Sequence, residues 1–171
     1  MKRLLLLSFA IFLSGCALVP HKLERLQWPS GTASLTGEGD LEATWAKEHF
    51  SGPFVMKMHY PGSFLLEVYG SFGQTLLQVK KEDGQFLLIA GDEKTTDEAV
   101  FEKRYGFSVC RLMDDLAARG SREETPGGFV MRREGYIVRY GQDRRGRRNI
   151  CWEGQKGSIC LTFDQIDFTG Q

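Results

Sequence analysis

The cysteines are the residues of this chain with the clearest chemical potential. Cys16 directly follows Leu13-Ser14-Gly15, at the end of an apolar stretch over residues 4–13 that comes after Lys2 and Arg3. A basic start, about ten apolar residues and a small-residue cleavage site are typical of a secretory signal, which is too short to span a bilayer. The thiol and the newly exposed amine of Cys16 would then be available for covalent acylation.

The segment Leu13-Ser14-Gly15-Cys16 resembles the lipobox of bacterial lipoprotein signals. The resemblance implies that residues 1–15 are a signal peptide, cleaved before Cys16, and that Cys16 carries a diacylglycerol and an N-acyl chain. An ordinary secretory signal with a chance cysteine is the alternative. Residues 16–30 are expected to form a lipid-anchored linker, and residues 31–171 a single domain. Ala17 is not Asp, which is compatible with sorting to the outer membrane.

Three further cysteines remain in the mature chain, so at least one thiol is unpaired in an oxidising compartment. Cys151 and Cys160 flank the turn over residues 154–157 symmetrically, so a hairpin would place them opposite each other. A cross-strand disulfide and two small apolar residues on one face are both consistent with this spacing. The third is Cys110. The Cys-x8-Cys spacing fits no zinc pattern, and the histidines lie far from it.

Sequence motifs of enzymes are missing from the chain. No Gly-x-Ser-x-Gly, His-Glu-x-x-His or P-loop pattern occurs. The segment Gly37-Glu38-Gly39-Asp40 lacks the strand-loop-helix context of a phosphate-binding loop, and it is interpreted as a strand bulge or turn. We therefore predict that the protein is not an enzyme, binds no metal and needs no cofactor beyond the lipid on Cys16.

Length and charge restrict the classes of protein further. Removal of residues 1–15 from the 171-residue chain leaves 156 residues, enough for one domain with a proper core. Loss of Lys2 and Arg3 leaves 20 basic against 22 acidic residues, a net charge of about −2. A nucleic-acid partner is not expected, because phosphate binding needs a clear positive excess.

The rest of the chain has mostly the pattern of strands separated by short turns, which indicates an antiparallel meander. Two short helices, over residues 95–105 and 109–119, interrupt it, with a cap at Ser108 and a stop at Gly106. We expect a mainly β (α+β) fold, in which a strongly curved antiparallel sheet forms a half-open barrel with two or three short helices as lid or plug. The expected strands cover residues 35–45, 54–60, 64–69, 75–80, 86–90, 129–133, 136–140, 149–153, 158–163 and 166–168.

Two of these segments resemble the LolB family of outer-membrane lipoproteins. Residues 64–79, which read FLLEVYGSFGQTLLQV, are similar to two apolar strands joined by a tight Pro-Leu-Gly-like loop in that family. Residues 135–140, GYIVRY, are similar to its Gly-Trp-x-Val-x-Tyr strand. The chain departs from the family pattern in the loop, Gly70-Ser71-Phe72-Gly73, and in a second helix without its Trp. These departures would suit a divergent relative with other cargo.

The resemblance implies a function and its partners. Members of the family accept acylated lipoproteins from a periplasmic carrier, the LolA-like partner, and insert them into the outer membrane. It implies a monomer on the periplasmic face of that membrane, with Phe72, flanked by Gly70, Ser71 and Gly73, reaching into the phospholipid. Packing of Phe72 against a neighbouring loop is the structural alternative. A protein-binding scaffold of the same fold and a carrier of free lipid are the alternative functions.

Two sets of residues are candidates for lipid contact. An apolar cavity for acyl chains is expected from one face of the strands and the second helix, and simple core packing is the favoured alternative for any single one of these residues. A basic loop is a candidate for phosphate head groups, or is a solvated hairpin tip. The cavity candidates are Phe54, Met56, Met58, Phe64, Leu66, Val68, Leu77, Leu112 and Met113; the head-group candidates are Arg144, Arg145, Arg147 and Arg148.

Overall fold

The computed structural model describes residues 28–45 and 48–169 of the chain. The expected signal peptide, the expected lipid-anchor residue Cys16 and most of the expected linker lie outside the described residues. Within them, no helix is long and apolar enough to cross a membrane.

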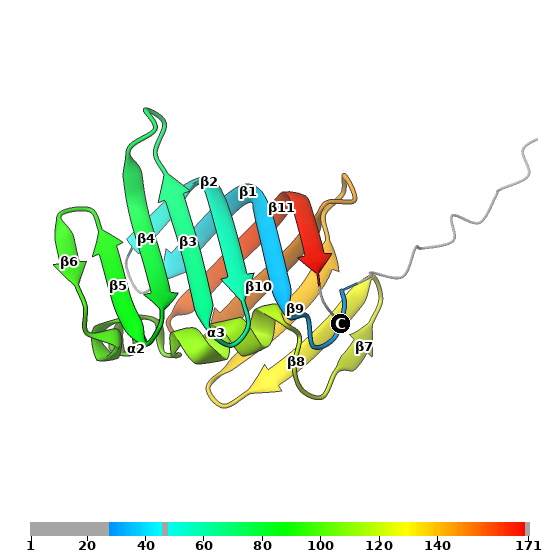
Figure 1. The fold of residues 1–171 in the computed structure, drawn as a ribbon. Coiled ribbons are helices and arrows are strands. Elements are labelled where there is room, and N and C mark those ends of the chain that lie inside the picture. Colours follow the sequence, from blue (N-terminus) through cyan, green and yellow to red (C-terminus); the bar gives the residue numbers. More distant parts are fainter. Residues whose placement is uncertain (1–27, 46–47, 170–171) are drawn as a thin grey trace, which may run out of the picture.

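The described residues form strands and two short helices (Figure 1). The elements are β1 (Ser34–Trp45), β2 (Glu48–His59), β3 (Ser63–Tyr69), β4 (Thr75–Glu82), β5 (Gln85–Ala90), β6 (Glu93–Thr95), α2 (Glu98–Tyr105), α3 (Val109–Leu116), β7 (Glu123–Thr125), β8 (Gly128–Arg133), β9 (Tyr136–Gln142), β10 (Arg148–Gly154) and β11 (Gly157–Thr169).

All strands of the described chain belong to one antiparallel sheet with the order β6-β5-β4-β3-β2-β1-β11-β10-β9-β8-β7. The predictions of a mainly β fold, an antiparallel meander and two helices are confirmed. The first and last long strands pair with each other, from Ser34 opposite Thr169 to Trp45 opposite Gly157. This pairing joins the two meanders into one sheet. The edge strands β6 and β7 do not pair with each other, so the sheet is not closed.

The register contains an irregularity where the sequence predicts a bulge or turn. The β1–β11 pairing shifts between Glu38 and Gly39, which confirms the bulge interpretation of residues 37–40. Gly39 lies so close to β11 that a Cβ atom there would be 2.0 Å from the Thr162 carbonyl oxygen. Only glycine permits this approach of the two backbones.

Both helices begin and end for local reasons. Asp97 caps α2 by accepting a hydrogen bond from the Ala99 amide, and Gly106 ends it in the left-handed conformation, at φ +83°. Ser108 caps α3, as predicted, through the Arg111 amide. Helix α2 starts later than predicted because Thr95 pairs with Leu88 in the sheet. Helix α3 ends at Leu116, before the predicted range does.

One face of the sheet is buried, and the two helices pack against it. Alternate residues of β1, including Leu35 and Leu41, face this core, as do the matching residues of the neighbouring strands. The aromatic rings of α2 and of the α2–α3 connection contact both meanders: Phe101 lies against Phe86 of β5, and Phe107 against Tyr136 of β9. The helices therefore fill the space over the middle of the sheet.

Cys151 and Cys160 lie opposite each other in the β10–β11 ladder and form a disulfide. This resolves the two readings that their spacing left open, and leaves Cys110 as the free and exposed cysteine of the described chain. The bridge is expected to stabilise the hairpin mainly by restricting the unfolded chain.

Replacing both cysteines, Cys151→Ser with Cys160→Ser, is expected to lower the free energy of unfolding by about 2–3 kcal/mol, the entropic cost of a loop of about ten residues. Urea unfolding followed by tryptophan fluorescence, without reductant, would measure this. The control is Cys110→Ser, which removes an exposed thiol and should leave the midpoint almost unchanged. Equal midpoints for the double variant and the wild type would contradict a stabilising bridge.

Candidate functional site

An apolar cavity of about 40 Å³ lies between the sheet and the two helices. Every lining side chain is aliphatic or aromatic. The walls come from β1 to β4, β10 and β11 on one side and from α2, α3 and their connection on the other. The lining residues are Leu41, Phe50, Met56, Phe64, Leu66, Leu77, Val79, Phe101, Tyr105, Phe107, Leu112, Leu116, Trp152, Ile159 and Leu161.

The structure divides the nine predicted cavity residues into two groups, although all nine are buried. Five of them line the cavity: Met56, Phe64, Leu66, Leu77 and Leu112. The other four, Phe54, Met58, Val68 and Met113, belong to the packed core beside it. The prediction includes Phe64 but misses the other aromatic residues of the lining, such as Phe107 and Trp152. The lining residues come from both helices and both meanders, so their place in one lining cannot be predicted before distant segments of the chain are folded together.

The cavity is small in this conformation. A volume of about 40 Å³ exceeds the ~10–15 Å³ that one water molecule needs, but it is well below the ~150 Å³ of an engineered apolar cavity that holds benzene. An acyl chain therefore has no room here unless the helices move away from the sheet.

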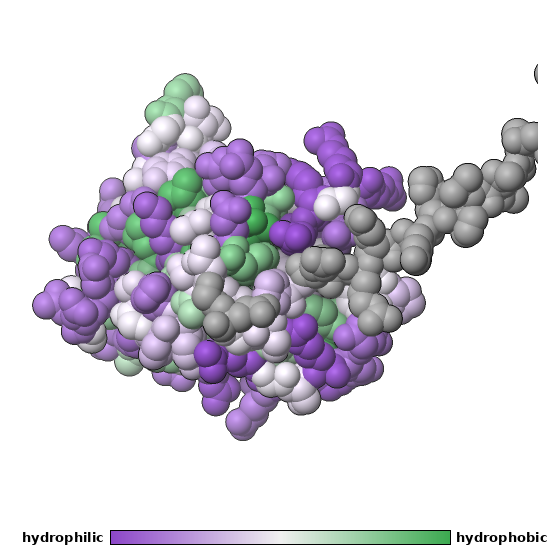
Figure 2. All heavy atoms as spheres, turned by 45° about the vertical axis from the view of Figure 1, so that its right-hand side comes forward, coloured by the Kyte–Doolittle hydropathy of each residue, from purple (hydrophilic) through white to green (hydrophobic). Residues whose placement is uncertain are grey.

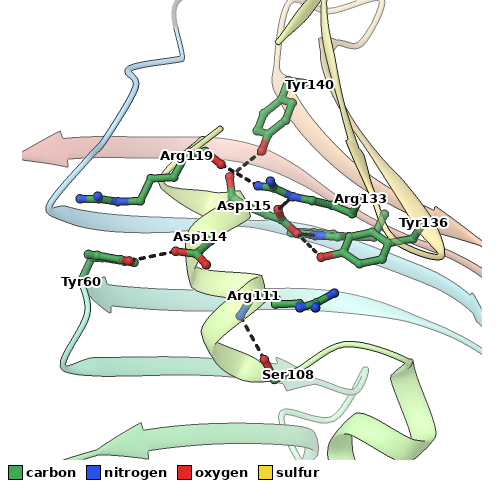
Figure 3. A network of polar contacts seen from close by, with 10 residues as sticks. Tyr60, Ser108, Arg111, Asp114, Asp115, Arg119, Arg133, Tyr136 and Tyr140 are labelled. Atoms are coloured by element: carbon green, nitrogen blue, oxygen red, sulfur yellow. Dashed lines mark hydrogen bonds and ion pairs between the residues drawn. The ribbon is translucent and has the colours of Figure 1, made fainter. Parts of the chain in front are cut away.

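A buried carboxylate fastens the end of α3 to the sheet (Figure 3). Asp115 is 0% exposed. Its oxygens accept hydrogen bonds from Arg133 Nε at 2.7 Å, from the Tyr136 hydroxyl at 3.0 Å and from Trp152 Nε1 at 3.0 Å. The Asp115 backbone carbonyl accepts a further bond from the Tyr140 hydroxyl at 2.5 Å. One helical residue is thus bound to strands β8, β9 and β10.

The electrostatics of this cluster follow from burial. Desolvation raises the pKa of Asp115, and the charge and hydrogen bond of Arg133 oppose that shift. Burial, together with the charge of Asp115, raises the pKa of Tyr136 as well. Tyr136 therefore stays protonated and donates to the carboxylate. Every buried side-chain nitrogen and oxygen of the cluster has a hydrogen-bond partner, as do all such atoms in the described part of the chain.

The two helices differ in how they are held. The turn after α3 has further ties to the start of the domain: Trp28 Nε1 donates to the Leu116 carbonyl at 3.0 Å, and the Gly31 amide donates to the Ala117 carbonyl at 2.7 Å. Helix α2 is held by ion pairs from Lys81 to Glu98 at 2.7 Å and from Arg104 to Glu93. Its last turn also accepts hydrogen bonds, from Trp45 Nε1 to the Arg104 carbonyl at 2.9 Å and from Lys156 Nζ to the Lys103 carbonyl at 2.8 Å. Among the described residues, only α3 adds a buried carboxylate, that of Asp115, which binds several strands.

Phe72 is 95% exposed, and it is the large hydrophobic residue that stands out on the described surface. It lies in the Phe72 loop, residues 70–74, between β3 and β4. The loop is an ordered turn: the Gly70 amide donates to the Gln74 carbonyl at 2.8 Å, and the Gly73 amide donates to the Gly70 carbonyl at 2.9 Å. Side-chain packing against a neighbouring loop, the structural alternative for Phe72, does not occur.

The Phe72 loop projects beyond the sheet. Figure 1 shows it above the ends of β3 and β4, at what we name the upper edge of the molecule. In Figure 2 the tip of this projection is hydrophobic, and it rises clear of its surroundings. The hairpin turn between β9 and β10, drawn in orange in Figure 1, projects from the same upper edge.

The β9–β10 turn, residues 143–147, carries most of the predicted head-group arginines, and the structure separates them. Arg147 is bound by three carboxylates, those of Asp40, Asp143 and Asp164. Arg148 lies over the ring of Phe168, 5.7 Å from its centroid. Arg144 and Arg145 are exposed, and their guanidinium groups form no ion pair with a residue of the described chain.

The described residues thus combine one open antiparallel sheet, two helices over an apolar cavity, and an exposed aromatic residue on a projecting loop. Within the described ranges, no group of three or more His, Cys, Asp and Glu residues is placed to hold a metal ion. Comparison with protein-family models and with curated proteins gives no match.

Proposed function

We propose that this protein is a LolB-like outer-membrane lipoprotein, which accepts the acyl chains of lipoproteins from a LolA-like periplasmic carrier and inserts them into the membrane. The observation that carries this proposal is the exposure of Phe72 on an ordered, projecting loop. An exposed aromatic ring in water is unfavourable, whereas the same ring is well accommodated at a membrane interface. Phe72 would enter the bilayer, and the acyl chains would follow beside it.

The proposed function needs a sheet that curves around the helices into a half-open barrel. Phe86 of β5 and Tyr136 of β9 are connected through two rings, with centroid distances of 6.0, 6.1 and 5.4 Å along the path Phe86, Phe101, Phe107, Tyr136. In a flat sheet, the seven strand spacings between β5 and β9 would amount to on the order of 33 Å. The shorter path supports a sheet that bends around the helices.

Acceptance of cargo requires the apolar cavity to open. Each CH₂ group of an acyl chain that leaves water contributes about 0.8 kcal/mol, so a long chain can drive a helix away from the sheet. The segment from α2 to the first turn of α3 would move, since Asp115 fastens only the end of α3 to the sheet. Transfer then needs no energy source if the affinity for the acyl chain rises from the carrier to the receptor and from the receptor to the membrane.

The lipid on Cys16 would tether the domain to the periplasmic face of the outer membrane, as a monomer. The partners would be the carrier, its acylated lipoproteins and the phospholipid, with no nucleic acid.

A protein-binding scaffold of the same fold is the second candidate. The filled interior favours it, because a cavity of about 40 Å³ does not require a ligand. A free-lipid carrier would share the opening step but not the delivery loop. Uptake of an acyl chain by the purified domain separates the scaffold from both lipid-handling functions.

The test is the transfer of a labelled lipoprotein from its carrier to this protein and then to liposomes. Phe72→Glu is expected to accept cargo normally and to deliver it at least about tenfold more slowly. The reason is that burial of a Phe side chain, here in the bilayer during delivery, contributes about 1.5–3 kcal/mol. Phe72→Leu, the matched apolar control, should deliver almost as the wild type does. Failure of the wild type to accept cargo would overturn the proposed function.

A further inference from the structure

The β9–β10 turn is built so that two arginines stand at its tip. Asp143 Oδ1 accepts hydrogen bonds from the amides of Arg145 at 2.8 Å and Arg147 at 2.9 Å. The Gly146 amide donates to the Asp143 carbonyl at 3.0 Å, and Gly146 adopts the left-handed conformation, at φ +78°. The turn therefore has a fixed shape, and Arg144 and Arg145 extend from it into solvent.

Arg147 secures this turn to the sheet below it. Its Nη1 atom lies 3.0 Å from Asp40 of β1 and 2.8 Å from Asp164 of β11, and its Nε atom lies 2.8 Å from Asp143. The Arg147 guanidinium lowers the pKa of Asp143. The carboxylates of β1 and β11 are thus engaged at the base of the turn, while the free positive charges are at the tip. A surface that meets the tip first interacts most strongly with those charges, because salt screens charges beyond about 8–10 Å.

The turn and the Phe72 loop project from the same edge of the molecule. Figure 1 shows both above the sheet, and Figure 2, after a rotation about the vertical axis, shows the hydrophobic and the hydrophilic projection still on the upper side. A flat surface that touches the Phe72 loop would therefore face Arg144 and Arg145 as well.

We infer that Arg144 and Arg145 are a second membrane contact, which binds the phosphate groups of anionic phospholipids and holds the upper edge against the bilayer while Phe72 inserts. The inference rests on the proposed function. It assigns Arg144 and Arg145 to lipid contact, whereas Arg147 and Arg148 make contacts within the domain. Aromatic insertion with basic side chains beside it is how proteins bind anionic membrane surfaces. A free phosphate would bind the arginines without any need for Phe72.

The test is the binding of vesicles by the full mature chain carrying Cys16→Ser, which cannot be acylated. Vesicles of phosphatidylcholine alone are compared with vesicles that also contain phosphatidylglycerol. The wild-type domain should bind the anionic vesicles more tightly. The double variant Arg144→Gln/Arg145→Gln should lose about 30-fold in affinity for anionic vesicles, about fivefold for each arginine, and nothing for neutral ones. Phe72→Ser should bind both kinds more weakly.

The matched control is Arg132→Gln/Arg139→Gln, which removes the same charge from side chains that are 70% and 52% exposed on β8 and β9. It should keep the anionic preference. The inference is overturned if this control loses as much affinity as the turn variant, or if the wild type binds both vesicles equally. Cargo acceptance from the carrier is measured separately, so failure of the inference and failure of the proposed function give different results.

Discussion

Replacing Asp115 with alanine is expected to lower the free energy of unfolding by about 3–5 kcal/mol, the range found when one partner of a buried ion pair is removed. The substitution leaves Arg133, Tyr136 and Trp152 without the acceptor to which they now donate. It also removes the side-chain links from the end of α3 to β8, β9 and β10, while the bond from the Tyr140 hydroxyl to the backbone carbonyl of residue 115 remains. Urea unfolding monitored by circular dichroism would measure the loss.

Asp114→Ala is the control for this prediction, because it removes the neighbouring carboxylate of the same helix. Asp114 accepts one described hydrogen bond, from the Tyr60 hydroxyl at 2.9 Å, in a partly buried site. Its loss should cost about 1 kcal/mol. If both variants unfold at the same urea concentration, Asp115 does not fasten the helix as we describe.

Cross-linking Lys81 to Cys110 is expected to abolish the uptake of an acyl chain. The Lys81 amine of β4 lies 3.2 Å from the Cys110 sulfur in the first turn of α3, so a short amine-to-thiol reagent can bridge them. The bridge would hold the first turn of α3 against the strand that carries Leu77 and Val79, two residues of the cavity wall, so this part of the segment could not leave the sheet. Uptake is measured with a fluorescent fatty-acyl probe on the full mature chain carrying Cys16→Ser.

The control for the cross-link is the same protein with Cys110→Ser, treated with the same reagent. It can be modified on single lysines but cannot form the bridge, so it should take up the probe as untreated protein does. Undiminished uptake by the cross-linked protein would show that the chain enters without separation of the helices and the sheet.

The strands and helices could be predicted largely from local patterns, because alternation and capping depend on neighbouring residues. Ser108 and Gly106 bound their helices as expected. The short edge strands β6 and β7 were missed, since three mostly exposed residues carry no alternation. The separate piece expected over residues 166–168 is part of β11, which continues through the polar pair Asp164-Gln165.

The candidate site was less accessible to sequence reasoning. Asp115 follows the apolar residues of α3 and has the appearance of a solvent-facing residue until Arg133, Tyr136 and Trp152 are brought around it from three strands. In the sequence, Arg144, Arg145, Arg147 and Arg148 form one basic group for the same reason. Only the folded chain places Asp40 and Asp164 beside Arg147 and leaves Arg144 and Arg145 free.

The position of β11 determines when, during synthesis of the chain, the complete sheet can form. The last strand of the chain lies between β1 and β10, and it supplies the ladder that joins the first meander to the second. Until the chain has been synthesised as far as Thr169, the two meanders have no common sheet, and their apolar faces remain open. Pairing between residues this distant along the chain is slow to form. The newly made chain would therefore be most exposed to aggregation and proteolysis before β11 has paired with β1 and β10.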